Sequence, residues 1–318
     1  MIKKILLLMI LGSINILLKA QDNIPVKAIP TEIFRTVKKD PNDTLNWHWK
    51  RGGIVNVNFS QGTLSNWAAG GDNFTLAINS YTNYFLLNKG KHHTWDNSMD
   101  FNFGFIQTTS LGTRKNDDRF EVLSKYGFML DTARKFYATG LFNFRTQFFD
   151  GNTYNGDSAF LSSTFLSPAY LFFAAGFDYK PFKTTSIFFS PLTDRMTIVA
   201  SKRLYEKGSY GVPPYQHSIN QLGAFASINV YQKLFKNVTY KGKMDLFSDY
   251  VNNPQNVDMY FTNYFFFKIN KFLSASYNLD MIYDDDVKIF GKNNSSPALQ
   301  LKSLIGIGFS MPINPVVN

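Results

Sequence analysis

The chain has no cysteine among its 318 residues. This absence excludes disulfide bonds, thiol catalysis, cysteine metal sites and the lipid anchor of a lipoprotein, which requires a cysteine directly after its signal. Beyond residue 18 no run of about twenty apolar residues occurs, so the sequence predicts no transmembrane helix. Charged residues make up only 18% of the chain, whereas aromatic residues reach 17%. Any membrane crossing must therefore be made by strands.

The N-terminus has the pattern of an export signal. Residues 1–4 are basic, residues 5–18 are apolar, and Ala20 is a small residue suited to a cleavage site. We predict a signal peptide over 1–20, with the cut uncertain by a few residues because Leu18 is larger than ideal. A helical anchor is the alternative, but the apolar run is too short for a comfortable span. Residues 21–50 lack periodicity and predict a periplasmic tether, and residues 51–318 predict the folded domain.

Long segments that alternate apolar and polar side chains dominate the rest of the sequence. In residues 95–105, the side chains of Trp95, Met99 and Phe103 alternate with polar ones such as Asp96 and Asn102. A period of two is the side-chain period of a β-strand. Strands of soluble sheets usually run about five or six residues, so these longer segments indicate a wall between lipid and water. The predicted fold class is all-β, a transmembrane antiparallel β-barrel of outer-membrane type.

The segments and their connections give a topology. Twelve strands are expected, at residues 53–60, 73–87, 92–107, 119–130, 135–148, 168–180, 185–200, 219–231, 238–249, 257–268, 271–283 and 298–310. Their connections alternate between longer ones, near 61–72, 108–118, 149–167, 201–218, 250–256 and 284–297, and short ones. Bacterial barrels have long extracellular loops and short periplasmic turns, which places both termini in the periplasm.

One segment leaves the strand number open between twelve and fourteen. Pro191 interrupts residues 186–198, and the apolar register shifts from Ile187 and Phe189 to Met196 and Ile198. A β-bulge that reverses the register explains both features. The alternative is a short hairpin, but the alternation of long and short loops favours the bulge.

The polar face of the strands predicts a charged lumen. Its candidate lining residues carry both signs, and they are Asp96, Asp100, Arg119, Glu121, Lys125, Arg145, Asp178, Lys241, Lys243, Asp245, Asp258, Asp280 and Lys302. They could line a selective pore, or they could neutralise one another and fill a narrow barrel. Bulky inward side chains occupy further volume: Tyr137, Leu141, Phe172, Phe225, Phe247 and Phe266. Small barrels are filled by their own side chains, so a constricted or plugged lumen is favoured.

Several segments resemble a known family when they are taken together and in order. The most specific are KMDLFSDY at 243–250 and NPQNVD at 253–258, joined by residues 59–71, 190–193, 269–275 and 282–286. They resemble domain-of-unknown-function family 3078, whose members are exported proteins typical of Bacteroidota. The resemblance covers most of residues 45–310 and implies an outer-membrane location. It implies no activity, because none is established for the family.

Other motifs give weak signals for chemistry. Asp284, Asp285 and Asp286 could hold a hard cation such as calcium, but consecutive side chains in an extended segment rarely converge. The glycine-rich segment 68–73 lacks the Lys-Ser/Thr pair of a phosphate loop, and it suits the descent of a loop into a strand or a small plug. A barrel phospholipase uses Ser, His and Asn on its outer face; here His217 adjoins Ser218, but neighbouring strand residues face opposite sides. We therefore expect no enzyme, cofactor or metal.

The net charge of the chain and its distribution indicate which partners to expect. The formal net charge is +10, and the cationic residues are dispersed, with a concentration in the short turns. Nucleic acid is not expected as a partner of an exported chain. The predicted partners are outer-membrane lipids and a periplasmic or outer-membrane protein. The predicted function is a narrow channel or a structural subunit of an envelope complex in the outer membrane, and the alternative is a lipid-modifying enzyme.

Overall fold

The computed structural model describes residues 48–63, 74–155, 158–182, 184–270, 273–284 and 296–317. The predicted signal peptide and nearly all of the predicted tether lie outside the described residues. Fourteen strands occur in the described part of the chain: β1 Trp49–Thr63, β2 Phe74–Lys89, β3 His93–Thr108, β4 Gly112–Met129, β5 Phe136–Thr146, β6 Gly151–Asn155, β7 Ser158–Ser163, β8 Ala169–Phe182, β9 Thr185–Ile198, β10 Ser218–Phe235, β11 Val238–Asp249, β12 Val257–Lys268, β13 Leu273–Tyr283 and β14 Gln300–Val317.

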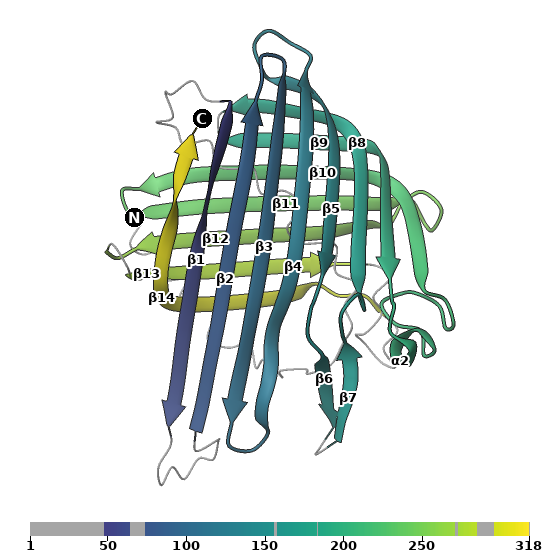
Figure 1. The fold of residues 1–318 in the computed structure, drawn as a ribbon. Helices are drawn as coiled ribbons and strands as arrows, with labels where there is room; N and C mark the ends of the chain where they lie inside the picture. The colour runs from purple at the N-terminus through teal and green to yellow at the C-terminus, as the bar shows by residue number, and fades with distance from the viewer. Residues whose placement is uncertain are drawn as a thin grey trace.

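Twelve of these strands form one closed antiparallel barrel, and β6 and β7 form a separate hairpin. The ring closes where β1 pairs with β14, from Lys50 opposite Val317 to Val57 opposite Phe309. In Figure 1 the near wall, with β1 to β4, crosses the far wall, with β10 to β13, at a steep angle. Such crossing follows from the tilt that strands need to close a barrel. The predicted barrel of twelve strands is confirmed.

The predicted connection at 108–118 is wrong in its extent. β4 begins at Gly112, which leaves only residues 109–111 as a turn after β3. The pairing of β3 with β4 continues past a register shift between Gly104 and Phe105. A strand can keep its ladder of hydrogen bonds beyond the apolar layer of the membrane, and its side chains there no longer need to alternate between apolar and polar. β4 can therefore begin with the polar residues 112–118.

The segment around Pro191 is one strand with a bulge, as the register argument predicted. β9 runs without interruption, and its pairing shifts by one residue against both neighbours at this point. Before the bulge Ser186 and Phe188 are buried; after it Thr193 and Arg195 are buried. Residues of opposite parity thus face the barrel interior on the two sides of Pro191, which has no N–H to lose from the ladder.

The loops at one end of the barrel pack into a cap. β6, β7 and the short helix α2 (Lys202–Tyr205) lie there together (Figure 1). Val199, Leu204 and Val212 form a buried cluster against side chains that include Leu161 and Tyr210. The hydroxyl of Tyr210 donates to the carbonyl of Ser162, and burial raises its pKa well above the usual range. The phenol therefore stays a donor that joins the two loops.

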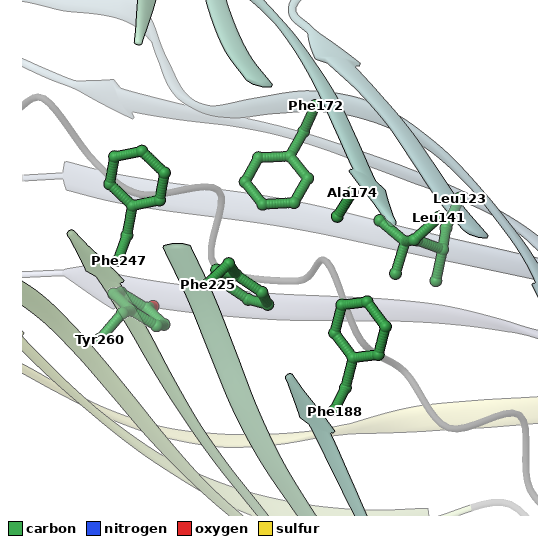
Figure 2. Close-up of a cluster of buried hydrophobic side chains, with 8 residues drawn as sticks. All are labelled: Leu123, Leu141, Phe172, Ala174, Phe188, Phe225, Phe247 and Tyr260. Carbon is green, nitrogen blue, oxygen red and sulfur yellow. The ribbon is translucent and has the colours of Figure 1, made fainter. Parts of the chain in front are cut away.

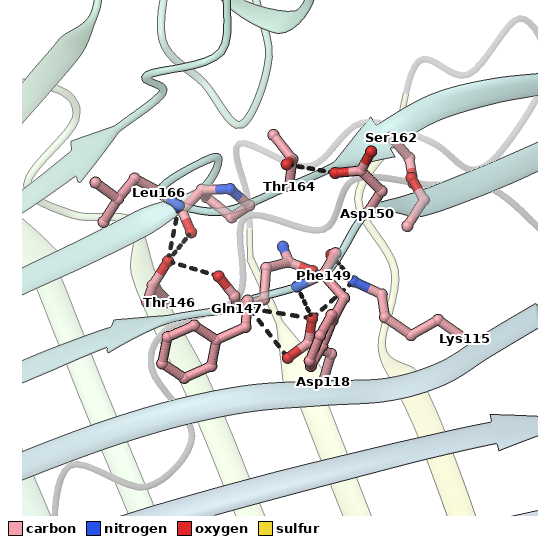
Figure 3. Close-up of polar contacts among 12 residues, drawn as sticks. Lys115, Asp118, Thr146, Gln147, Phe149, Asp150, Ser162, Thr164 and Leu166 are labelled. Carbon is pink, nitrogen blue, oxygen red and sulfur yellow. Dashed lines mark hydrogen bonds and ion pairs between the residues drawn. The ribbon is translucent and has the colours of Figure 1, made fainter.

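An ion pair anchors the segment that leads into this cap (Figure 3). Lys115 Nζ lies 3.0 Å from Asp118 Oδ2 and also donates to Gln147 Oε1 at 2.9 Å. Asp118 in turn accepts the backbone N–H groups of Phe148 and Phe149. These contacts hold the chain after β5 against the outer surface of β4. Long loops are extracellular in bacterial barrels, and by this rule the sequence predicts that this end lies outside the cell.

The outer face of the wall is apolar. Large side chains there are about half exposed, among them Phe59, Phe128, Phe173, Phe177, Phe189, Leu192, Leu301, Ile307 and Phe309. Near the opposite end Trp49 packs on Trp95 with ring centroids 6.2 Å apart, and Trp95 Nε1 donates to Ser124 Oγ. Tryptophan and tyrosine gather where membranes meet water. Among the described residues, no helix is both long and apolar enough to cross a membrane.

Candidate functional site: the barrel interior

The inner face of the barrel carries buried charges. Because side chains alternate along a strand, each strand turns one set of polar residues inward. Of the predicted lining residues, the structure buries Asp100, Glu121, Arg145, Asp178, Lys243, Asp245, Asp258 and Asp280. A buried charge is costly unless it is paired. The inner face accordingly contains hydrogen-bonded charge clusters.

Asp178 on β8 is the centre of one cluster. Its Oδ2 lies 2.7 Å from Lys125 Nζ on β4 and 3.5 Å from Lys180 Nζ, and Ser186 Oγ donates to Oδ1 at 2.5 Å. Lys180 also lies over the ring of Tyr137, 4.5 Å from its centroid. One carboxylate thus joins β4, β8 and β9 across strands that are distant in sequence.

A second cluster lies on β2 to β5. Asp100 accepts hydrogen bonds from Tyr81 at 2.5 Å and from Asn83 at 3.0 Å. Its register partner on β4 is Glu121, to which Asn143 donates at 2.7 Å. Two carboxylates are therefore neighbours, and polar donors from both sides stabilise them.

A third cluster lies near the ends of β9 to β12 on the side of the cap. Arg195 donates through Nε to Gln221 at 2.9 Å and through a terminal nitrogen to Asp258 at 3.3 Å. Its guanidinium lies 4.2 Å from the ring centroid of Phe247, a cation–π arrangement. Gln221 Nε2 in turn donates to Asp249 Oδ2 at 3.2 Å, which extends the network.

A fourth cluster connects β10 and β11. Lys243 Nζ lies 2.7 Å from Asp245 Oδ2, and Ser227 Oγ donates to Asp245 Oδ1 at 2.7 Å. Asn229 donates to Ser227 at 3.0 Å. Together the four clusters give the interior a polar lining that is mostly satisfied by its own side chains.

An apolar cluster narrows the interior beside these charges. Its buried members come from seven strands, and they are Leu123, Leu141, Phe172, Ala174, Phe188, Phe225, Phe247 and Tyr260. Figure 2 shows these side chains gathered on the inside of the wall. The rings of Phe172 and Phe225 meet edge to face with centroids 5.1 Å apart. Burial of Tyr137, Leu141, Phe172, Phe225 and Phe247 agrees with the predicted inward set, whereas Phe266 is half-buried.

The remaining predicted lining residues are more open. Asp96, Arg119 and Lys125 are half-buried, and Lys241, near the N-terminal end of β11, is exposed. Lys302 stands opposite Asp280 in the backbone register of β13 and β14. Sequence reasoning missed Lys180, Arg195, Gln221 and Asp249. The register reversal at Pro191 was the available signal for Arg195, because it turns that side chain inward.

The weaker chemical motifs do not assemble a reactive site within the described part of the chain. His217 directs Nδ1 to the carbonyl of Val199 at 3.2 Å and packs on the ring of Tyr205. Asp284 is buried, while Asp285, Asp286 and the glycine-rich segment 68–73 lie outside the described residues. Among the residues described, no group of three or more His, Asp or Glu could hold a metal ion.

A closed antiparallel wall that is apolar outside and charged inside defines an integral β-barrel of outer-membrane type. The model of a family described as "Protein of unknown function (DUF3078)" matches residues 59–152. This match confirms the resemblance over that part of the chain. No curated protein matches the chain.

Solved structures with a similar chain path are outer-membrane proteins. The COG4313 outer membrane channel from Pseudomonas putida F1 is 9% identical, with a TM-score of 0.41; the match covers 87% of this chain and 100% of that one. The NanC porin is 9% identical, with a TM-score of 0.39, covering 81% and 98%. OmpT, an outer membrane protein of Vibrio cholerae, is 7% identical, with a TM-score of 0.31, covering 83% and 96%. Identities and scores this low carry no functional argument.

Proposed function

We propose that the protein is a narrow channel of the outer membrane. The observation that carries this proposal is the contrast between the two faces of the closed wall, since charged clusters line the inside and large apolar side chains cover the outside. Such an interior suits water and small polar solutes. Twelve strands make a small barrel, and wide aqueous channels belong to barrels of sixteen or more strands. The apolar cluster narrows the path further.

The proposal includes the route to the membrane and the partners. Residues 1–20 have the pattern of a signal peptide, so the mature chain would begin close after Ala20 and reach the outer membrane by export. Mass spectrometry of the mature protein's N-terminal peptide tests this cleavage, and an intact residue 1 would contradict it. Membrane lipids are the partners that the apolar outer face would contact. A periplasmic or outer-membrane protein partner is a further part of the hypothesis.

Conductance tests the channel. Purified protein in a planar lipid bilayer should give small single-channel steps. Phe225→Ala, inside the apolar cluster, should raise the unit conductance, because it removes a ring from the constriction. Phe189→Ala is the matched control, since Phe189 is 50% exposed on the outer face of the adjacent strand. Equal conductance of both variants and the wild type would place the constriction elsewhere. Absence of any steps would contradict the channel and favour a structural subunit or, with lipid hydrolysis, an enzyme.

A further inference from the structure

Inner-face charges are unequal at the two ends of the barrel. Ten charged residues in the described part of the chain face inward by register and lie within six residues of a strand's periplasmic end. Eight lysines and two aspartates meet this condition among the described residues: Lys50, Lys89, Lys125, Lys180, Lys233, Lys241, Lys243, Lys268, Asp96 and Asp178. Their formal sum is +8 − 2 = +6.

The rest of the inner face has the opposite balance. Beyond six residues from the periplasmic ends, the inward side chains that the structure describes include four arginines and seven carboxylates: Arg114, Arg119, Arg145, Arg195, Asp100, Asp117, Glu121, Asp245, Asp249, Asp258 and Asp280. With Lys302, which the backbone register places opposite Asp280, the formal sum is +5 − 7 = −2. The inward cations at the periplasmic end are all lysines, whereas those further out are the four arginines and, by backbone register, Lys302.

A pocket at the periplasmic mouth has the same positive character. It is a small hollow of about 20 Å³ between the β2–β3 and β4–β5 turns, and Lys89, Lys91 and Arg134 contribute to its lining. Asp131 in the neighbouring turn accepts the backbone N–H groups of Lys135 and Phe136, so its carboxylate is engaged by the turn itself. Charged walls around a confined path raise the local concentration of counter-ions.

We propose that the lumen is electrically polarised, with a lysine-lined periplasmic vestibule that gathers small anions and an outer half that gathers cations. This inference rests on the proposed channel function. When the extracellular side is positive, cations enter the lumen through the outer half, where they are concentrated. Anions enter at the same time through the periplasmic vestibule, where they are concentrated. Both ions then accumulate in the lumen, whereas the reverse voltage depletes both. The channel therefore passes more current when the extracellular side is positive.

Single-channel currents at both voltage signs in about 0.1 M KCl test this inference. A cysteine at Asn155, labelled from one chamber, reports the orientation of each inserted channel. We expect a current ratio of at least about two in the stated direction. In about 1 M KCl the ratio should fall towards one, because the screening length shortens from about 10 Å to about 3 Å.

Charge reversal identifies the source of the asymmetry. The triple variant Lys233→Glu, Lys241→Glu and Lys268→Glu changes three exposed residues on adjacent strands and brings the vestibule sum from +6 to +5 − 5 = 0. It should lose most of the rectification. The matched control Lys202→Glu, Arg203→Glu and Lys207→Glu makes the same change of net charge on the exposed extracellular cap and should keep the direction.

The outcomes separate the two proposals. Symmetric current at low salt, or rectification of the opposite sign, would overturn the polarised lumen while the channel stands. Unchanged rectification in the vestibule variant would also overturn it. Absence of current would instead contradict the channel itself.

Discussion

A lipid-facing side chain and its neighbour on the same strand lie in different solvents, and this contrast governs what each position tolerates. Phe177 lies near the middle of β8 and is 54% exposed on the outer face. Phe177→Arg should reduce the free energy of unfolding by about 2–4 kcal/mol, because it places a charge in the hydrocarbon layer. Denaturant titration of the barrel folded into lipid vesicles measures the difference.

A position closer to the membrane surface on the same strand provides the control for this substitution. Phe182 is the last residue of the same strand and is 70% exposed. Phe182→Arg should cost only about 0–1 kcal/mol, since the penalty for arginine falls near the membrane interface. If both variants lost the same stability, Phe177 would not lie at membrane depth.

The sequence predicted the inner residues of regular strands well, because alternation assigns a face to every second residue. Asp178 and Lys125 were predicted separately, but their 2.7 Å ion pair was not, since it depends on which strands become neighbours in the closed ring. Arg195 was missed because the bulge at Pro191 reverses the face of the residues that follow it. Lumen charges are thus predictable from periodicity, whereas their pairing depends on register and closure.

At the scale of elements, the bulge in β9 requires a residue without a Cβ atom at one position of the neighbouring strand β8. Gly176 stands where β9 has an extra residue, and a Cβ there would lie 2.1 Å from the carbonyl oxygen of Phe189 and 2.6 Å from Cα of Ser190. Both atoms belong to the backbone and cannot move aside without breaking the ladder. Gly176→Val should therefore lower the yield of folded barrel, measured by the gel shift between unboiled and boiled samples.

Gly140 on β5 is the matched control for this prediction. It also lies in a barrel strand, opposite Ala175, but a Cβ at Gly140 would meet nothing within 4 Å. Gly140→Val should fold as well as the wild type. Equal folding of the two variants would mean that the bulge does not require glycine at position 176.

Strands were more predictable than loops. The barrel strands follow the period of two that the sequence shows except at register shifts such as the one in β9, and their ends differ from the predicted ones mainly where strands continue beyond the apolar layer, as in β4. The β6–β7 hairpin and helix α2 were not predicted. Both lie in the cap, where contacts between loops stabilise them, so local periodicity carries little signal for them.

At the scale of the whole molecule, long extracellular loops and short periplasmic turns predict the orientation of the barrel in the membrane. Asn155 ends β6 in the cap, Lys207 is exposed after α2, and Ala133 and Lys236 lie in turns at the opposite end. Single cysteines at these four positions have a clean background, because the chain has no cysteine. An impermeant thiol reagent applied to intact cells should label positions 155 and 207 and spare 133 and 236. The reverse pattern would invert the barrel.

The central claim is that one wall of strands separates lipid from a polar interior, and consecutive positions of β2 test it most directly. Ala77, Ile78, Asn79, Ser80 and Tyr81 are all half-buried, and their register predicts that only 78 and 80 face lipid. Each position would carry a single cysteine with a fluorophore, in vesicles that contain spin-labelled lipid. We predict strong quenching at 78 and 80 and weak quenching at 77, 79 and 81. Quenching with a helical period, or equal quenching at all five positions, would contradict the barrel wall.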